Sequence, residues 1–184
     1  MEKVAVSVLG TDRPGIVAAV SKILLEHQCN IEDVSQTSLQ TEFAGIFITT
    51  VPEKVKSEDL LSSLQKGLEP FGAYVLLKPI ETTGEGFSPS ASEPFVVTTV
   101  GADRLGLVAG VTEVMARFGV NISNLRAVFR GGDDPSRNTM IYEVDIPDDI
   151  DTRSFRQALQ DRAVELGLDL SIQHRDVFEA INRV

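Results

Sequence analysis

The hydrophobic positions in the first half of the chain switch between two periods. Val4–Leu9 is short and rich in valine, which is typical of a buried strand. Residues 14–28 carry apolar side chains at helical spacing, and Pro14 suits a first helical position because that position needs no N–H. Asn30–Leu39 and Phe43–Val51 alternate apolar and polar residues, which predicts two strands joined by a tight turn.

The same order of elements then runs through the rest of the chain. A second helix is predicted from the apolar residues Leu60, Leu61, Leu64, Leu68 and Phe71. Gly72 closes it at the capping position, and Ala73–Leu77 is predicted to form a last strand. In the second half, the predicted strands are Phe95–Val100, Asn121–Arg130, Asn138–Ile146 and Leu168–Gln173, and the predicted helices cover 105–118 and 152–166. A short helix from Arg175 to Arg183 is added at the end, with apolar residues that we expect to pack on its own sheet.

The two halves share one motif. Gly10-Thr-Asp-Arg-Pro-Gly-Ile-Val-Ala-Ala-Val20 recurs as Gly101-Ala-Asp-Arg-Leu-Gly-Leu-Val-Ala-Gly-Val111, an offset of 91 residues. Nine of 22 positions are identical between 10–31 and 101–122. Two copies of such a long period predict two small domains rather than a solenoid.

Each half consists of two strand–helix–strand units joined by a hairpin. The predicted fold class is therefore α+β, with two ferredoxin-like βαββαβ domains in tandem. Each domain should be a four-stranded antiparallel sheet with two helices on one face. The first domain is predicted over 1–80 and the second, with its C-terminal helix, over 93–184; residues 81–92, rich in Gly, Ser, Thr and Pro, are predicted to be a linker.

Composition restricts the classes of partner. The net charge is −10 with scattered Lys and Arg, so direct binding to nucleic acid is not expected, and an effect on transcription would act through another protein. No apolar run could span a bilayer and no signal peptide is recognisable, so we expect a cytoplasmic protein without membrane attachment. The single cysteine, Cys29, is expected to be a small buried hydrophobe.

No segment carries the residues of catalysis in a known pattern. The chain lacks a nucleophile elbow, a P-loop and zinc-ligand spacing, and its two histidines, His27 and His174, do not correspond in the repeat. The acidic turn 131–135 is expected to be a solvated hairpin tip, because a calcium loop of the EF-hand type needs more oxygen ligands. We therefore expect no enzyme activity, no cofactor and no metal.

The repeated turn is the candidate binding site. Its residues, in corresponding pairs, are Asp12 and Asp103, Gly15 and Gly106, and Asn30 and Asn121. The aspartates precede a helix whose first N–H groups suit a carboxylate, and each aspartate can accept from an ammonium group. The glycines leave room for close approach, and the asparagines can both donate and accept. This combination suits the zwitterion of an α-amino acid.

A structural role also explains each of these residues taken alone. An aspartate near a helix start is a common N-cap, and an asparagine after a helix is an ordinary turn residue. Shared ancestry of the two halves could preserve a folding motif as well as a ligand site, so both interpretations stay open.

The motif resembles that of the ACT domain family. Residues 12–17, Asp-Arg-Pro-Gly-Ile-Val, and then Asn30-Ile31 are similar to the family's first loop, first helix and second strand. Residues 103–108 and 121–122 match in the second half, with Leu105 in place of the usual proline. Amino-acid-binding members commonly have Asn where Asp12 and Asp103 stand. A chain of two such domains resembles the glycine cleavage system transcriptional repressor group.

This resemblance implies a non-enzymatic regulator that responds to a small amino acid, with glycine or serine as first candidates. It further implies a homodimer, ligands bound between ACT domains near the first loop, and action through a protein partner such as a transcriptional activator. The ligand-binding residues it implies are Asp12, Gly15, Asn30, Ile31, Asp103, Gly106, Asn121 and Ile122.

Two other functions remain open at this point. One is a protein–protein adaptor whose ligand site is vestigial. The other is a regulatory module associated with an amino-acid or one-carbon metabolic enzyme, because the motif in residues 12–17 also resembles the N-terminal ACT domain of formyltetrahydrofolate deformylase. The catalytic domain of that enzyme would need residues that this chain does not have.

Overall fold

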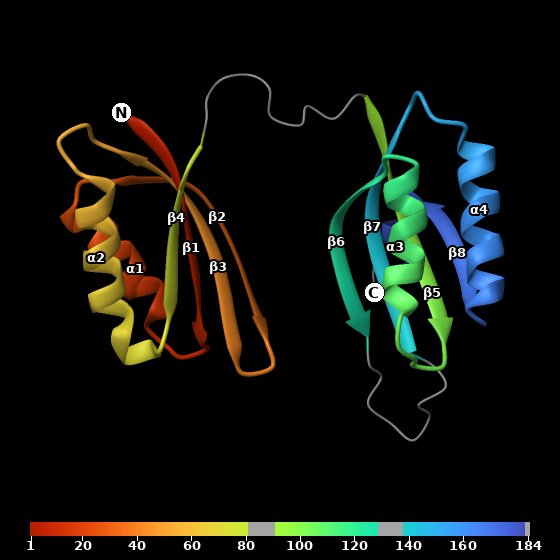
Figure 1. Cartoon of the computed structure of the whole chain (residues 1–184), viewed down its shortest axis with the longest axis horizontal. Helices are drawn as coiled ribbons and strands as arrows, with labels where there is room; N and C mark the ends of the chain where they lie inside the picture. The colour runs from red at the N-terminus through yellow and green to blue at the C-terminus, as the bar shows by residue number, and fades with distance from the viewer. Residues whose placement is uncertain (81–90, 129–137, 183–184) are drawn as a thin grey trace. The chain divides into compact units, whose positions relative to one another are not determined.

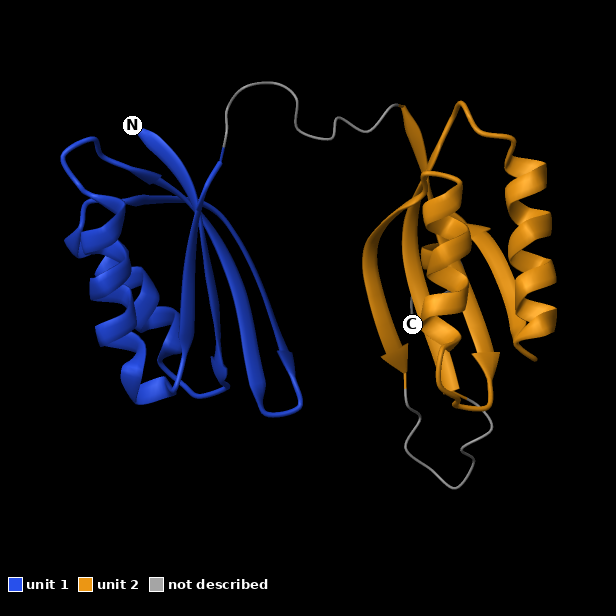
Figure 2. Ribbon diagram, in the orientation of Figure 1, with its two compact units in different colours: residues 1–86 blue, residues 87–184 orange. Residues whose placement is uncertain are grey.

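The computed structural model describes residues 1–80, 91–128 and 138–182 and divides into two compact units, residues 1–86 and 87–184 (Figure 2). The division falls inside the expected linker, most of which lies outside the described residues. The turn 131–135 and the last two residues of the strand predicted over 121–130 lie outside them as well.

Unit 1 has the predicted element order (Figure 1). Its elements are β1 (Glu2–Thr11), α1 (Ile16–Glu26), β2 (Asn30–Leu39), β3 (Glu42–Val51), α2 (Ser57–Leu68), a 3-10 turn (Glu69–Phe71) and β4 (Tyr74–Pro79). All neighbouring strands are antiparallel, in the order β2-β3-β1-β4, and both helices cover one face of the sheet.

Unit 2 repeats this arrangement. Its elements are β5 (Ser92–Gly101), α3 (Leu107–Arg117), β6 (Asn121–Val128), β7 (Asn138–Pro147), α4 (Thr152–Glu165), β8 (Asp169–His174) and α5 (Arg175–Asn182). The antiparallel order is β6-β7-β5-β8. The predicted α+β class and the two βαββαβ sheets, each with helices on one face, are therefore confirmed.

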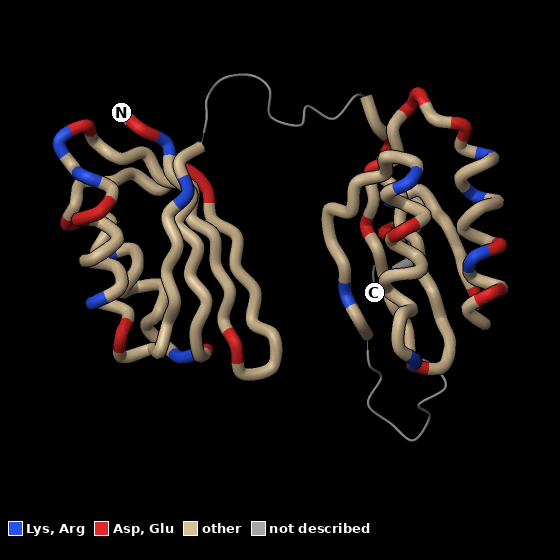
Figure 3. Tube along the Cα trace, in the orientation of Figure 1, with Lys and Arg blue, Asp and Glu red and all other residues tan. Residues whose placement is uncertain are grey.

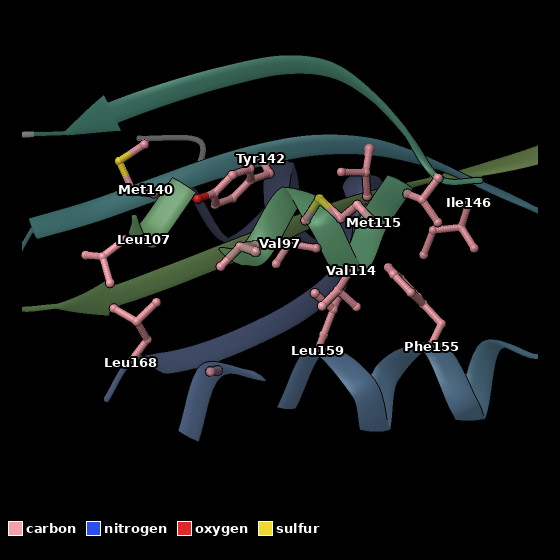
Figure 4. Close-up of a cluster of buried hydrophobic side chains, with 14 residues drawn as sticks. Val97, Leu107, Val114, Met115, Met140, Tyr142, Ile146, Phe155, Leu159 and Leu168 are labelled. Atoms are coloured by element: carbon pink, nitrogen blue, oxygen red, sulfur yellow. The ribbon is translucent and has the colours of Figure 1, made fainter. Parts of the chain in front are cut away.

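Each unit has its own core between sheet and helices. In unit 1, Leu60, Leu64 and Leu68 lie one turn apart along α2, so all three face the sheet and are fully buried. In unit 2, Tyr142 and Val97 from the sheet meet Met115 of α3 and Leu159 of α4 (Figure 4). Two separate cores explain how two short domains can each fold around its own sheet.

The added helix α5 packs on its own sheet, as expected. It contacts β5 and β8, and its first residue, Arg175, forms an ion pair with Asp145 of β7 (3.6 Å). Since Val144 and Ile146 face the core of unit 2, Asp145 between them lies on the opposite face of the sheet. The first residue of α5 therefore pairs with the face that α3 and α4 leave uncovered.

Candidate functional site

The repeated loop links the first strand to the first helix of each unit. In unit 1 the chain leaves the sheet at Asp12, whose backbone N–H donates to the carbonyl of Thr41 (2.8 Å). Gly15 then turns the chain with φ 102°, a backbone conformation that L side chains rarely adopt, and α1 begins at Ile16. The predicted helix start at Pro14 was thus two residues early.

Neither aspartate acts as an N-cap. Gly15 and Gly106 are the N-cap residues of α1 and α3, both with positive φ, and no side chain caps either helix. A Cβ on Gly106 would meet no atom within 4 Å, and one on Gly15 would make only ordinary contacts with Phe71. The repeat keeps glycine here because of backbone conformation, and the space beside it is open to solvent.

A pocket of about 380 Å³ opens beside this loop in unit 1. It is lined by Asp12, Arg13, Pro14, Gly15, Ile16 and Val17 from the loop and helix start, by Gln36 and Ser38 of β2, and by Phe43 of β3. The pocket therefore combines the predicted Asp12 and Gly15 with a charged side chain and two neutral polar side chains that the sequence had not indicated.

The polar groups of this pocket are available for a ligand. Within the described part of the chain, the side chains of Asp12 and Arg13 make no hydrogen bond or ion pair, and both are exposed. The backbone N–H groups of Val17 and Ala18, in the first turn of α1, likewise have no acceptor among the described residues. The Asp12 carboxylate, which can accept from a cation, therefore lies near the Arg13 guanidinium and the N–H groups at the start of α1, which can donate to an anion.

In the corresponding loop of unit 2, both charged side chains are hydrogen-bonded to other residues of the same unit. The Asn138 amide donates to Asp103 Oδ1 (3.4 Å), and the Arg104 guanidinium donates to the carbonyl of Leu166, where α4 ends. The register places Ala127 where unit 1 has Gln36, and the counterpart of Ser38 lies outside the described residues. The two loops share a backbone but differ in the polar groups they offer.

The structure does not bring the asparagines to the loop of their own unit. Asn30 begins β2 beside Thr50, which pairs with Lys3 at the start of β1, whereas Asp12 follows the end of β1. The nine residues from Lys3 to Thr11 span about 26 Å of strand. Asn121 of unit 2 occupies the same end of its sheet, opposite the loop.

The predicted isoleucines have a structural role in the fold. Ile31 and Ile122 are half-buried and pack against the hydrophobic cores of their units. Asn30 and Asn121 are exposed, and their side chains make no hydrogen bond within the residues that the structure describes. A part for these four residues in the same ligand site would require a second ACT domain to bring them to the loop.

The other side chains considered from the sequence offer no further site. Cys29 is buried, and this burial raises the pKa of its thiol. Over residues 1–80, 91–128 and 138–182, no three His, Cys, Asp or Glu side chains gather in a group that could hold a metal ion. None of the described helices is long and apolar enough to cross a membrane.

Comparison with known proteins assigns both units to one type of domain. The family model described as "ACT domain" matches residues 2–75 and again 93–173. A UPF0237 protein of Methanopyrus kandleri is 43% identical over 79 residues, which is 42% of this chain and 88% of that protein. A UPF0237 protein of Methanosarcina mazei is 34% identical over 94 residues, covering 50% of this chain and 98% of its own length.

Two solved structures match nearly the whole chain. An unknown protein from Galdieria sulphuraria has a TM-score of 0.77 at 25% identity and covers 94% of this chain and 98% of its own. A "putative glycine cleavage system transcriptional repressor" has a TM-score of 0.69 at 17% identity, covering 94% and 96%. At this identity, the second likeness shows a shared fold alone.

Proposed function

The chain belongs to the ACT domain family, and from this premise we propose that it is a non-enzymatic regulator that binds a small amino acid at the loop pocket of unit 1 and acts through protein partners. The family assignment makes a regulatory ACT-domain protein the general class. The observation that carries the finer proposal is the pocket beside which the side chains of Asp12 and Arg13 and the N–H groups of Val17 and Ala18 lack partners within the described chain.

The charges of the pocket match those of an amino acid zwitterion. The Asp12 carboxylate would accept from the ligand's ammonium group, while the Arg13 guanidinium and the N–H groups of Val17 and Ala18 would donate to its carboxylate. Gln36 and Ser38 line the same pocket and could hydrogen-bond a short polar side chain such as that of serine. The glycine cleavage description of one structural neighbour makes glycine the first ligand to test.

We propose unit 1 as the binding unit because the equivalent side chains of unit 2, Asp103 and Arg104, are already hydrogen-bonded within that unit. A ligand at the second loop would have to displace the Asn138 amide from Asp103 and the Leu166 carbonyl from Arg104. The same loop in unit 1 has no such bond to break among the described residues. In unit 2, Asp103, Gly106 and Ile122 would then serve the fold. Asn30, Ile31 and Asn121 would join a ligand only from another ACT domain.

Titration calorimetry tests the proposal on the full chain with glycine, serine and alanine, alongside the variants Asp12→Ala and Asp103→Ala. Loss of a charged hydrogen-bond partner costs about 1.5–3 kcal/mol, so Asp12→Ala should weaken binding at least about tenfold. Asp103→Ala is the matched control and should bind like the wild type. If none of the amino acids produced heat at millimolar concentration, sensing at this pocket would be excluded and the adaptor function would become the better account.

A further inference from the structure

The outer face of the sheet in unit 1, the face without helices, is apolar over its centre. Three rows of side chains cross it in register: Thr37, Ala44, Leu9 and Tyr74; Ser35, Ile46, Ser7 and Leu76; Asp33, Ile48, Ala5 and Lys78. We call these twelve residues the outer face of sheet 1. Leu9, Ile46, Tyr74 and Leu76 are 50–79% exposed and surround a groove of about 280 Å³.

The fold itself does not require exposed apolar side chains here, because the corresponding face of unit 2 has fewer apolar residues and none of them is exposed. At the positions of Tyr74 and Leu76, unit 2 has Asp169 and Ser171. At the position of Ile48 it has Glu143, which pairs with Arg126 (3.7 Å) and accepts from the Asn124 amide (2.8 Å). On this face unit 2 keeps Val96, Val100 and Ile141, but none of the three is exposed. Unit 1 leaves Leu9, Ile46, Tyr74 and Leu76 exposed, which indicates that its face has a partner.

Charge is sparse on this face and is arranged in a particular way. Figure 3 shows that charged residues of unit 1 gather on the helices and toward the ends of the strands. Within the three central rows only Asp33 and Lys78 are charged, and they stand in one row on opposite edge strands, β2 and β4. Both are exposed, and neither forms an ion pair with any described residue.

This arrangement is self-complementary under one symmetry. Two sheets stack face to face with their strands roughly aligned and about 10 Å apart. A two-fold axis parallel to the strands and close to β1 reverses the strand order, so β3 of one copy lies over β4 of the other. Ile46 and Ala44 then face the partner's Leu76 and Tyr74, and Asp33 comes within reach of the partner's Lys78. A two-fold axis across the strands would instead reverse the rows and bring like-charged edges together.

We propose that the outer face of sheet 1 is the interface between two copies of this chain, related by a two-fold axis parallel to its strands. Each copy contributes the same apolar centre, as an isologous interface requires, and two Asp33–Lys78 pairs fix the register. The uncharged centre also keeps contact between two chains of net charge −10 free of like-charge repulsion at its core. This inference does not depend on amino-acid binding.

Sedimentation equilibrium of the full chain tests the interface. The wild type should have a mass of about 40 kDa, twice the 20.0 kDa of one chain. Ile46→Asp places a carboxylate in the apolar centre and should give the single-chain mass at the same concentration. Ile141→Asp, at the corresponding position on the outer face of unit 2, is the matched control and should leave the mass at 40 kDa.

A charge exchange at two exposed positions avoids any question of folding. Asp33→Lys should raise the dissociation constant of the dimer about tenfold, because it sets two lysines against each other at both ends of the interface. Combining it with Lys78→Asp should restore the wild-type constant. A single-chain mass for the wild type at 200 µM (a loading on the order of 10² µM suits contacts of this size) would overturn the proposal and leave a different protein as the occupant. The proposal would also be overturned if Ile46→Asp remained a dimer, or if the double variant had the same dissociation constant as Asp33→Lys.

Glycine calorimetry and sedimentation of the wild type together separate this proposal from the preceding one. Glycine binding by a wild type of single-chain mass supports the pocket alone, and a 40 kDa wild type that does not bind glycine supports the interface alone. The two proposals can therefore fail independently.

Discussion

Replacing Gly15 by alanine should destabilise unit 1 through backbone conformation alone. Gly15 has φ 102° and ψ −11°, outside the left-handed helical well near φ 57° and ψ 47° that non-glycine residues can visit. Gly72, with φ 59° and ψ 29°, lies close to that well. Steric clash contributes little at either site, since Phe71 at 3.8 Å is the nearest atom to a Cβ on Gly15 and nothing lies within 4 Å at Gly72.

The magnitude follows from two opposing effects. A left-handed conformation costs an L residue about 1–2 kcal/mol, and sparsely populated regions cost about 1–3 kcal/mol. Alanine offsets roughly 0.4–1 kcal/mol of this by restricting the unfolded chain. We expect Gly15→Ala to lower the free energy of unfolding of unit 1 by about 1–2 kcal/mol and Gly72→Ala by about 0.5–1 kcal/mol.

Urea unfolding followed by hydrogen-exchange mass spectrometry measures this loss, because peptides from the two units report on each unit separately. With a slope of about 1–2 kcal/mol per molar urea for a domain of this size, Gly15→Ala should lower the midpoint of unit 1 by roughly 0.5–2 M. The midpoint of unit 2 should not move. A Gly15→Ala variant as stable as the wild type, or more stable than Gly72→Ala, would refute the conformational explanation for the repeated glycine.

Three further perturbations have defined outcomes. Hydrogen bonds from Ser154, foremost from its hydroxyl, lower the pKa of Asp151, the N-cap residue of α4. The stabilising effect of this N-cap should therefore be constant above about pH 5 and decline as the pH falls below about 4. Comparing the acid unfolding of Asp151→Ala with that of the wild type measures this decline. Leu64→Ala should cost about 2–5 kcal/mol in unit 1 and Leu159→Ala a similar amount in unit 2, each visible by hydrogen exchange in its own unit only. Burial raises the pKa of the Cys29 thiol, so iodoacetamide should alkylate it slowly at pH 7 and much faster in urea that unfolds unit 1.

The repeat and the periodicity of apolar residues were enough to predict the fold. Apolar side chains that alternate in strands and recur every three or four residues in helices determine which face each element buries, and the handedness of crossover connections left few topologies for this order of elements. The first residue of each helix was harder to predict from the sequence. The proline at 14 suggested a first helical position, whereas the positive φ of Gly15 delays α1 to Ile16.

There is a physical reason why the sequence did not reveal Gln36 and Ser38 as pocket residues. Alternation counted from the inward-facing Ile31 would place Asp33, Ser35 and Thr37 against the helices. A β-bulge between Ile31 and Asp33 shifts the alternation by one residue, so that Gln36 and Ser38 face the helix side and line the pocket. Unit 2 has the same irregularity between Ile122 and Asn124. A sequence pattern alone does not reveal an extra residue of this kind.

Identity between the two halves was the first sign of a site, yet it mainly reports the backbone. The glycine recurs because both loops need a positive φ, and the recurring Asp and Arg are bound inside unit 2 but have no partner among the described residues of unit 1. The informative positions are those that differ, such as Gln36 against Ala127 beside the loop, or Tyr74 against Asp169 on the outer face. In this duplicated fold, the shared glycine identifies a backbone conformation that each copy needs, and the functions of the copies are found where the surroundings of the shared side chains diverge.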